Sequence, residues 1–388
     1  MSAAPHRAIS LAIGGFIAMA AAMGIGRFVY TPILPFMAEG IGLTKPQAGL
    51  IASANFLGYL LGALAAASPF LPGGKRGWFI AALAGSALST AAMGLVSTVP
   101  AFLLLRLAGG IASAFVLVFA SALVLERLAA MNRPGLSALH FAGVGTGIAL
   151  SALMIGGLNA AGLDWRAQWL ASGGLTLLAL LAAVRLVPPD AATPAAAPAA
   201  AGVGGKDRRM IRLVLAYGLF GFGYVITATF ISTIARATPA LQAVEPLVWL
   251  VVGLAAIPSV GLWVAIGRRL GNDASYALAS LTQAIAVALS VLVANAPALL
   301  AAALLLGGTI MGLTALGLIQ ARQLARGDPR QSLALMTAAF GLGQMIGPSF
   351  AGYAYALSGS FRAPSLAAAA ALVIAAALVG LPLRRHRL

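Results

Sequence analysis

One arginine in this sequence lies inside an apolar run, where a charged side chain needs a physical reason. Residues 24–35 read GIGRFVYTPILP, and the acidic residue nearest to Arg27 along the chain is Glu39. A guanidinium stays charged and offers a planar fork of donors that matches a carboxylate, sulfonate or phosphate. We therefore expect Arg27 to bind an organic anion. The structural alternative is that it donates to backbone carbonyls opened by Pro32 and Pro35, or to a Tyr or Asn of a packed neighbour.

Polar side chains at helical spacing accompany this arginine. Arg27, Tyr30 and Thr31 are three and four residues apart and share one helical face, and Asn55 and Tyr59 share another. Each pair also suits a hydrogen bond between membrane helices, which is the commoner role of such residues. The candidate substrate-binding residues are Arg27, Tyr30, Thr31, Asn55, Tyr59, Arg106, Tyr224, Thr227 and Gln344.

Two further ionisable residues fall inside apolar runs. Arg106 lies near the end of its run, where it can reach water or Glu39, so a structural role is favoured. His140 is the one histidine inside such a run, and histidine titrates near neutral pH, which makes it the candidate for proton coupling. Because His140 lies only a few residues from the end of its run, a neutral, hydrogen-bonded histidine is the alternative.

The composition places these residues in a membrane. Hydrophobic residues make up 61% of the 388 residues and charged residues 8%, which is far from the balance of water-soluble domains. A bilayer core about 30 Å thick needs roughly 20 apolar residues per helix, and the runs lack the two-residue alternation of a membrane β-barrel. We expect an all-α membrane protein with twelve transmembrane helices, at residues 9–38, 46–70, 77–97, 99–125, 135–161, 165–187, 210–236, 246–266, 274–294, 297–323, 332–358 and 362–383.

The basic residues indicate the orientation of these spans. Lys and Arg in short loops are retained on the cytoplasmic side, and an amino terminus inside places most of the 24 Lys and Arg residues there. We therefore expect both termini in the cytoplasm. The alternative is a cleaved signal peptide with small residues at 18–22, which would leave eleven spans and reverse the orientation.

The remaining composition argues against several kinds of site. The formal net charge of +16 comes from basic residues scattered over short loops, and these form no basic and aromatic face for nucleic acid. The sequence has no cysteine and three histidines without paired spacing, so we expect no metal site. No pair of acids and no nucleophile with a base lies at membrane depth, so we expect no catalytic residue and no cofactor.

The chain has the pattern of a duplication around a linker. At an offset of about 197 residues, GIGRFVYTPILP falls on GFGYVITATFIS (221–232), and GVGTG (143–147) falls near GLGQM (341–345). Six spans in each half return the chain to the same side, so the halves are parallel repeats. The segment PPDAATPAAAPAAAGVGGKDRR has the composition of a flexible linker. We expect an N-terminal six-helix bundle at 1–187, a cytoplasmic linker at 188–209 and a C-terminal six-helix bundle at 210–388.

Glycines and prolines gather on the first, fifth and eleventh expected spans. Glycines let membrane helices approach closely, and prolines bend helices that must open and close. Gating and packing roles are expected for Pro32, Pro35, Gly143, Gly147, Gly343, Gly347 and Pro348.

Several of these segments resemble a known family over the whole chain. GIGRFVYTPILPFM, LIASANFLGYLLGAL (50–64), HFAGVGTGIALSALM (140–154), DWRAQW (164–169), GFGYVITATF (221–230) and MTAAFGLGQMIGP (336–348) are similar to the YbfB/YjiJ branch of the major facilitator superfamily. The resemblance implies two pseudo-symmetric bundles around a central cavity lined by the first, fourth, seventh and tenth helices. It would turn Arg27, Arg106 and the Tyr224 segment inward. The branch has no broadly assigned substrate.

These observations combine into one functional expectation. We expect a secondary active transporter that moves a small organic anion by alternating access, with H⁺ as the candidate coupling ion. The alternatives are an efflux carrier of neutral or amphiphilic compounds, and a passive facilitator. The Ala-rich, Lys-poor composition favours a GC-rich bacterial genome and hence a multi-pass protein of the inner membrane. We expect a monomer whose partners are the small-molecule substrate and the lipid bilayer.

Overall fold

Helices form the framework of the computed structural model, which describes residues 3–68, 70–188, 208–325 and 329–381. Within these residues, twelve helical segments are long and apolar enough to cross a membrane, which confirms the twelve predicted spans. The elements are α1 (Ala3–Met19), the π-helix η1 (Ala20–Arg27), α2 (Tyr30–Ile41), α3 (Lys45–Ala66), α4 (Lys75–Ala92), η2 (Met93–Leu95), α5 (Val99–Ala130), η3 (Pro134–Leu136), α6 (Ser137–Ala160), α7 (Trp165–Leu186), α8 (Arg208–Ala237), η4 (Pro239–Val244), α9 (Glu245–Leu270), α10 (Asn272–Leu292), α11 (Ala296–Leu324), α12 (Pro329–Ser358) and α13 (Arg362–Gly380).

Local signals in the sequence end one span and begin the next. Gly42 has a positive φ of 66° and ends α2. Thr44 then caps α3 through a reciprocal pair of hydrogen bonds with Gln47. Asp164 and Asn295 cap α7 and α11 by accepting from a backbone N–H three residues further on. Such caps satisfy the N–H groups that a helix start leaves without a partner, so these turns are encoded where they occur.

The first span is not one regular helix. It consists of α1, the π-helix η1 and α2, with a turn at residues 28–29. Pro32 and Pro35 lie early in α2 and have no N–H to donate to the preceding turn. Short π-helical segments are rare and occur frequently at functional sites. Arg27 is the last residue of η1, so its side chain leaves the span where the backbone is irregular.

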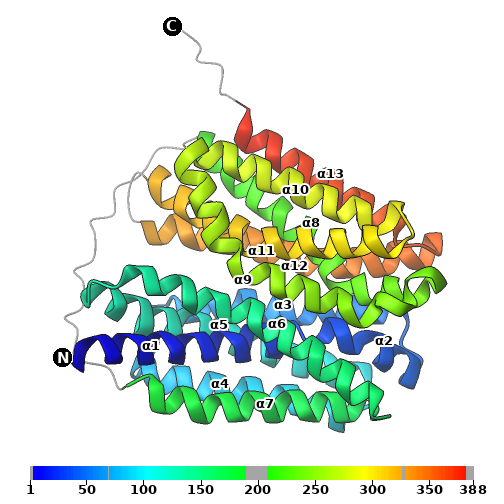
Figure 1. Ribbon diagram of the computed structural model, residues 1–388, viewed down its shortest axis with the longest axis horizontal. Helices are drawn as coiled ribbons and strands as arrows, with labels where there is room; N and C mark the ends of the chain where they lie inside the picture. The colour runs from blue at the N-terminus through cyan, green and yellow to red at the C-terminus, as the bar shows by residue number, and fades with distance from the viewer. Residues whose placement is uncertain (1–2, 69, 189–207, 326–328, 382–388) are drawn as a thin grey trace, which may run out of the picture.

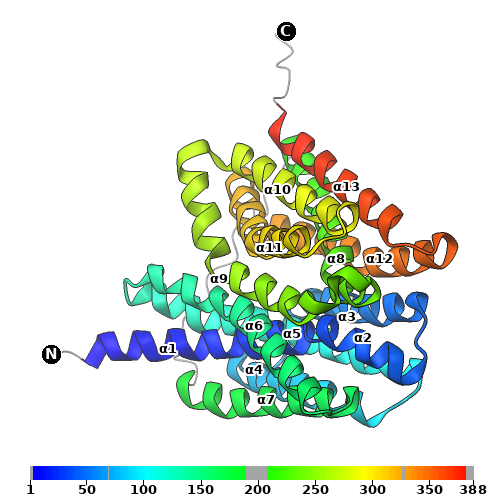
Figure 2. The same cartoon turned by 45° about the vertical axis from the view of Figure 1, so that its right-hand side comes forward.

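The twelve spans form two six-helix bundles, which we call the N bundle (α1–α7) and the C bundle (α8–α13). In Figure 1 the N bundle, blue to green, lies below the C bundle, green to red. The bundles meet where α3 packs on α12, α6 on α9 and α2 on α8. Both views place α3 and α9 at this boundary (Figure 2). Residues 189–207 of the predicted linker lie outside the described residues.

The glycines expected to pack helices lie at very close approaches. A Cβ on Gly143 or on Gly147 would lie 2.2 Å from a carbonyl oxygen of the first span. In the C bundle, a Cβ on Gly343 would lie 2.1 Å from a carbonyl oxygen of α8, and one on Gly347 would lie 2.5 Å from a methyl group of α8. The carbonyl oxygen of Pro348 approaches a glycine of α3 in the same way, across the boundary between the bundles. A larger residue at these positions would push the helices apart.

Candidate functional site

Arg27 lies between the two bundles and is held by neutral partners. The residue is 3% exposed, and its Nη2 donates to Oε1 of Gln344 on α12 at 2.8 Å. Gln344 in turn donates through Nε2 to the hydroxyl of Tyr224 on α8. The Nε of Arg27 is buried and has no hydrogen-bond partner among the described residues. A guanidinium of the N bundle is therefore joined to the C bundle by an amide and a phenol.

Aromatic rings cover much of the remaining surface of this guanidinium. The Cζ of Arg27 lies 3.9 Å from the ring centroid of Tyr59 and 4.8 Å from that of Phe56. Cation–π contacts of this kind reach about 2 kcal/mol when they are removed from water. On the side of the C bundle, Tyr224 stacks on Phe340 with ring centroids 5.9 Å apart. The site thus combines one cation with several aromatic faces.

The charge of Arg27 has no acidic partner in the described part of the chain. The ion pairs found there lie at the ends of spans, and they join Lys75 with Glu126, Arg209 with Asp273, and Arg236 with both Glu39 and Glu245. A buried charge is costly unless it is paired or fully hydrogen-bonded. Arg27 is therefore stabilised by dipoles and ring faces, and a ligand that brings a negative charge would add to that stabilisation.

Arg106 on α5 supports the irregular backbone beside Arg27. Its Nη1 donates to the carbonyl oxygen of Gly26 at 3.2 Å, and its Nη2 donates to the carbonyl oxygen of Arg27 at 3.0 Å. The Nδ2 of Asn55 donates to the carbonyl oxygen of Arg106 at 2.9 Å. These bonds lie at the end of the π-helix, where backbone acceptors lose their regular partners. The residue that uses freed carbonyls of the first span is thus Arg106, although the sequence suggested that role for Arg27.

Among the other candidate residues, Tyr30 and Thr31 have hydrogen-bond partners and Thr227 has none among the described residues. The hydroxyl of Tyr30 donates to the carbonyl oxygen of Ala48 at 2.9 Å, which ties α2 to α3. The hydroxyl of Thr31 donates to the carbonyl oxygen of Ala228 at 2.7 Å, which ties the N bundle to the C bundle. The hydroxyl of Thr227 is buried and has no partner among the described residues. Thr227 therefore keeps a hydrogen-bonding group available beside the boundary of the bundles.

The sequence itself shows the family to which the chain belongs. Residues 19–380 match the family described as "Uncharacterised MFS-type transporter YbfB". This chain is a member of that transporter family. No curated protein matches the sequence. Membership of the family and the two-bundle fold make the protein a major facilitator transporter rather than an enzyme.

Solved structures of other transporters share this fold. An aspartate-to-alanine mutant of the nucleoside transporter NupG has a TM-score of 0.74 at 14% identity, covering 95% of this chain and 98% of its own. The NupG structure without that mutation has a TM-score of 0.71 at 16% identity, covering 96% and 98%. A bacterial homologue of the human lysosomal transporter Spinster, inward-facing and occupied, has a TM-score of 0.70 at 16% identity, covering 97% and 96%. At these identities the similarity shows the fold alone.

In this transporter the two bundles are in contact at the end of the molecule where the first span finishes, near Glu39. There Arg236 of α8 donates two hydrogen bonds to Glu39 of α2, at 2.6 and 2.9 Å. Deeper in the molecule, about one helical turn from Phe56, the hydroxyl of Ser349 on α12 donates to that of Ser53 on α3 at 2.7 Å. Under the predicted orientation, this closed end faces the outside.

His140 lies within the N bundle of the transporter. It is fully buried, its Nε2 is 3.3 Å from the hydroxyl oxygen of Ser121 on α5, and a Cβ on Gly15 of α1 would lie 2.5 Å from its Nδ1. These neighbours belong to the same bundle. The structure does not bring His140 together with Arg27. The role of His140 in proton coupling and its alternative, a neutral hydrogen-bonded histidine, both stay untested.

Sequence reasoning missed the contact between Glu39 and Arg236. It also missed the aromatic cluster that Phe340 forms with Tyr217, Phe220 and Tyr224. A signal for the ion pair was present, because the two residues are 197 positions apart, which is the offset of the repeat. Opposite charges at equivalent positions of two parallel repeats can meet on the axis that relates them. The aromatic cluster had no comparable signal, since phenylalanines are common throughout an apolar chain.

Proposed function

We propose that this transporter is a secondary carrier of a small organic anion and that Arg27 supplies the counter-charge for the cargo. The observation that carries the proposal is the buried guanidinium at the boundary of the bundles, whose hydrogen-bond partner Gln344 is neutral. Arg106 adds a second buried positive charge nearby, and its hydrogen bonds to backbone carbonyls do not neutralise it. Two cations in a site of low dielectric constant favour the entry of an anion.

Binding of such a cargo would exchange one partner of Arg27 for another. A carboxylate in place of the Gln344 amide would add an ion pair and could accept two parallel hydrogen bonds from the guanidinium, whereas the amide oxygen accepts one. It would also offset part of the cost of burying the guanidinium. Because the contact between Arg27 and Gln344 joins the two bundles, its replacement by cargo would link binding to the movement of one bundle against the other.

The surroundings of Arg27 favour a cargo with a single anionic group and an apolar body. The polar groups close to it include the amide of Gln344 and the hydroxyls of Tyr224 and Tyr59. The rings of Phe56 and Tyr59 face the guanidinium. A cargo rich in hydroxyl groups would leave several of them without partners, and each buried unpaired group costs about 1–3 kcal/mol.

We further propose alternating access as the mechanism, H⁺ as the coupling ion and the bacterial inner membrane as the location, with a monomer as the working unit. Alternating access is supported by contacts such as those of Arg236 with Glu39 and of Ser53 with Ser349, which join opposite bundles and must part in another state. The inner membrane is supported by the Ala-rich, Lys-poor composition.

An efflux carrier of neutral or amphiphilic compounds, or a passive facilitator, is the second candidate. It is favoured by the same aromatic faces, because Tyr59, Phe56 and Gln344 together stabilise Arg27 without a ligand. In that case Arg27 serves to hold the bundles together.

The two candidates are separated by solute counterflow in proteoliposomes. Liposomes preloaded with a monocarboxylate are expected to take up the labelled compound, and Arg27→Gln is expected to abolish the uptake, whereas Arg185→Gln at an exposed position preserves it. An imposed proton gradient should then drive accumulation. Counterflow of neutral compounds that survives Arg27→Gln would refute the anion carrier, and mere equilibration of the anion would identify a facilitator.

A further inference from the structure

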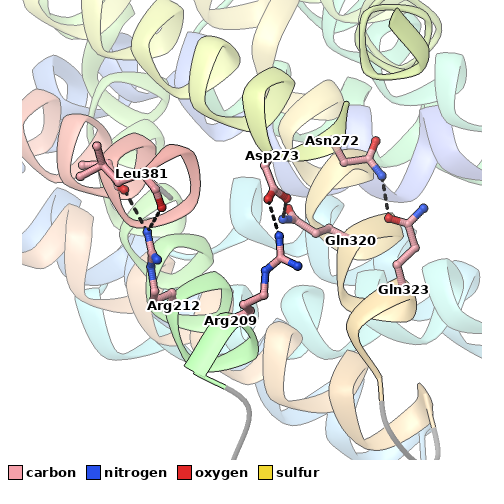
Figure 3. Close-up of polar contacts among 8 residues, drawn as sticks. Arg209, Arg212, Asn272, Asp273, Gln320, Gln323 and Leu381 are labelled. Carbon is pink, nitrogen blue, oxygen red and sulfur yellow. Dashed lines mark hydrogen bonds and ion pairs between the residues drawn. The ribbon is translucent and has the colours of Figure 1, made fainter. Parts of the chain in front are cut away.

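A polar cavity lies in the C bundle, far along the spans from the contacts that close the bundles at Glu39. It has a volume of about 250 Å³ and lies where α8 and α10 begin and where α11 and α13 end. Because four membrane spans start or stop at this level, the cavity lies at the depth of lipid headgroups. Figure 3 shows its polar walls, which are formed by Arg209, Arg212, Asp273 and Gln320.

One wall of this cavity presents a cation. The Nη2 of Arg212 donates to the carbonyl oxygens of Leu381, at 2.7 Å, and Ala377, at 3.4 Å, at the end of α13 (Figure 3). A cation at the carboxyl end of a helix is stabilised by the helix dipole. None of the ion pairs among the described residues involves Arg212. Its guanidinium has five N–H donors, so donors and a full positive charge remain for a ligand.

The facing wall presents an acceptor. The Nε2 of Gln320 donates to Oδ1 of Asp273, and Arg209 pairs with Oδ2 of Asp273 at 3.0 Å. The carboxylate therefore fixes the orientation of the Gln320 amide, because a reversed amide would turn its oxygen toward the negative charge. The Oε1 of Gln320 is left buried and without a partner among the described residues. Buried acceptors in proteins are nearly always satisfied, so this oxygen calls for a donor.

We propose that this cavity binds the headgroup of a membrane phospholipid. The phosphodiester would lie at Arg212, where a guanidinium makes charge-assisted bonds to phosphate. The end of the headgroup, an ammonium or a hydroxyl, would donate to Oε1 of Gln320. Leu213 and Leu324 also line the cavity and would contact the apolar part of the lipid. Among the described lining residues, two arginines and one aspartate give an excess of positive charge, which suits a phosphodiester.

The chemistry of the two walls can be tested by lipid binding. The full-length protein, purified in detergent and stripped of lipid, is titrated with phosphatidylethanolamine, phosphatidylglycerol and phosphatidylcholine of identical acyl chains, and bound lipid is counted by native mass spectrometry. The first two carry a terminal donor, and the choline ammonium has none. We expect both donor-bearing lipids to bind about tenfold more tightly than phosphatidylcholine, which corresponds to one hydrogen bond to a buried acceptor.

Variants of Arg212 test the contribution of its positive charge to lipid binding. Arg212→Gln is expected to weaken binding of the donor-bearing lipids about tenfold, and Arg212→Lys, which keeps the charge, is expected to retain most of it. The control is Arg76→Gln in the N bundle, because Arg76 donates to the carbonyl oxygens of Val184 and Val187 at the end of α7 in the same manner. That control removes an equivalent bond to a helix end without touching the cavity.

The results that would overturn the proposal are specific. Equal binding of all three lipids would remove the role of the Gln320 acceptor. Equal losses in Arg212→Gln and Arg76→Gln would show that helix ends, and not the cavity, control lipid binding. Glycerophosphoethanolamine, which has the headgroup but no acyl chains, should compete only weakly, and competition as tight as that of the intact lipid would assign the site to a soluble phosphodiester instead of a lipid.

Discussion

Glu39 and Arg236 occupy equivalent positions in the two repeats, 197 residues apart, and they form an ion pair with each other. Thr31 and Ala228 have the same separation and are also joined by a hydrogen bond. In a molecule built from two parallel repeats, equivalent positions touch only near the axis that relates them. The contact between α2 and α8 therefore marks this axis at the closed end of the bundles, where opening must break it.

A disulfide between α3 and α12, across the boundary of the bundles, should stop transport. The hydroxyl oxygens of Ser53 and Ser349 lie 2.7 Å apart in opposite bundles, and the sequence has no cysteine. We expect the double variant Ser53→Cys, Ser349→Cys to cross-link on oxidation, as seen by a shift in gel mobility, and to lose uptake until it is reduced. The two single variants serve as controls. A cross-linked protein that still transports would show that these helices need not separate.

The ion pair between Glu39 and Arg236 should favour the closed end by a small amount. Both side chains are partly exposed, at 60% and 30%, and such pairs contribute about 0–1 kcal/mol. In the double-cysteine background, Glu39→Gln is therefore expected to slow cross-linking by up to about fivefold. The charge reversal Glu39→Arg with Arg236→Glu should restore the rate only in part, because Glu245 lies 3.8 Å from the guanidinium of Arg236 and would repel a carboxylate at that position. An unchanged rate in Glu39→Gln would mean that the pair does not affect opening.

Substitution of Arg106 and substitution of Arg27 should have different effects on thermal stability. Arg106→Gln removes hydrogen bonds from a buried cation to the carbonyl oxygens of Gly26 and Arg27, and each is expected to contribute about 1.5–3 kcal/mol. Arg27→Gln removes a buried charge that has no carboxylate partner among the described residues, so it should leave the melting temperature unchanged or raise it. Thermal unfolding in one detergent compares the two variants. A larger loss in Arg27→Gln would reverse their assigned roles.

A substitution of His140 tests whether this histidine couples transport to protons. Its neighbours Ser121 and Gly15 belong to the N bundle, so we expect His140→Gln to lower thermal stability and to preserve the dependence of uptake on external pH. The measurement is uptake by proteoliposomes over a range of pH values, with Ser121→Ala as the control for the local hydrogen bond. A pH profile that becomes flat in His140→Gln alone would establish this histidine as the coupling residue.

The twelve spans could be predicted because each depends on its own residues. An apolar run of membrane length forms a helix because a bilayer offers its backbone N–H and C=O groups no other partners. Side-chain caps at Thr44 and Asp164 mark where two of these helices begin. The π-helix before Arg27 could not be predicted in this way. The carbonyl oxygens of Gly26 and Arg27, at its end, accept hydrogen bonds from Arg106, which lies 79 residues from Arg27 in the sequence. The irregular segment therefore depends on a contact with α5, and residues 20–27 alone do not reveal that contact.

The candidate site was predictable in its residue types and not in its pairings. Arg27, Tyr224 and Gln344 were identifiable as polar residues in apolar surroundings, and the structure joins them in one chain of hydrogen bonds. Their order in that chain depends on how α12 lies against the first span, and no local pattern specifies that placement. Conversely, Tyr30 has the right spacing for a ligand contact, but its hydroxyl is used by the backbone of α3.

The central claim, that Arg27 is the counter-charge of an anionic cargo, is tested most directly by a thermal-shift screen. Purified protein and Arg27→Gln are compared with small organic anions, cations and neutral solutes at two pH values, since a ligand that binds the folded state raises its melting temperature. We predict that shifts are confined to anions and are lost in Arg27→Gln. Shifts caused by neutral or cationic solutes that persist in Arg27→Gln would contradict the claim and leave Arg27 as a residue that packs the two bundles together.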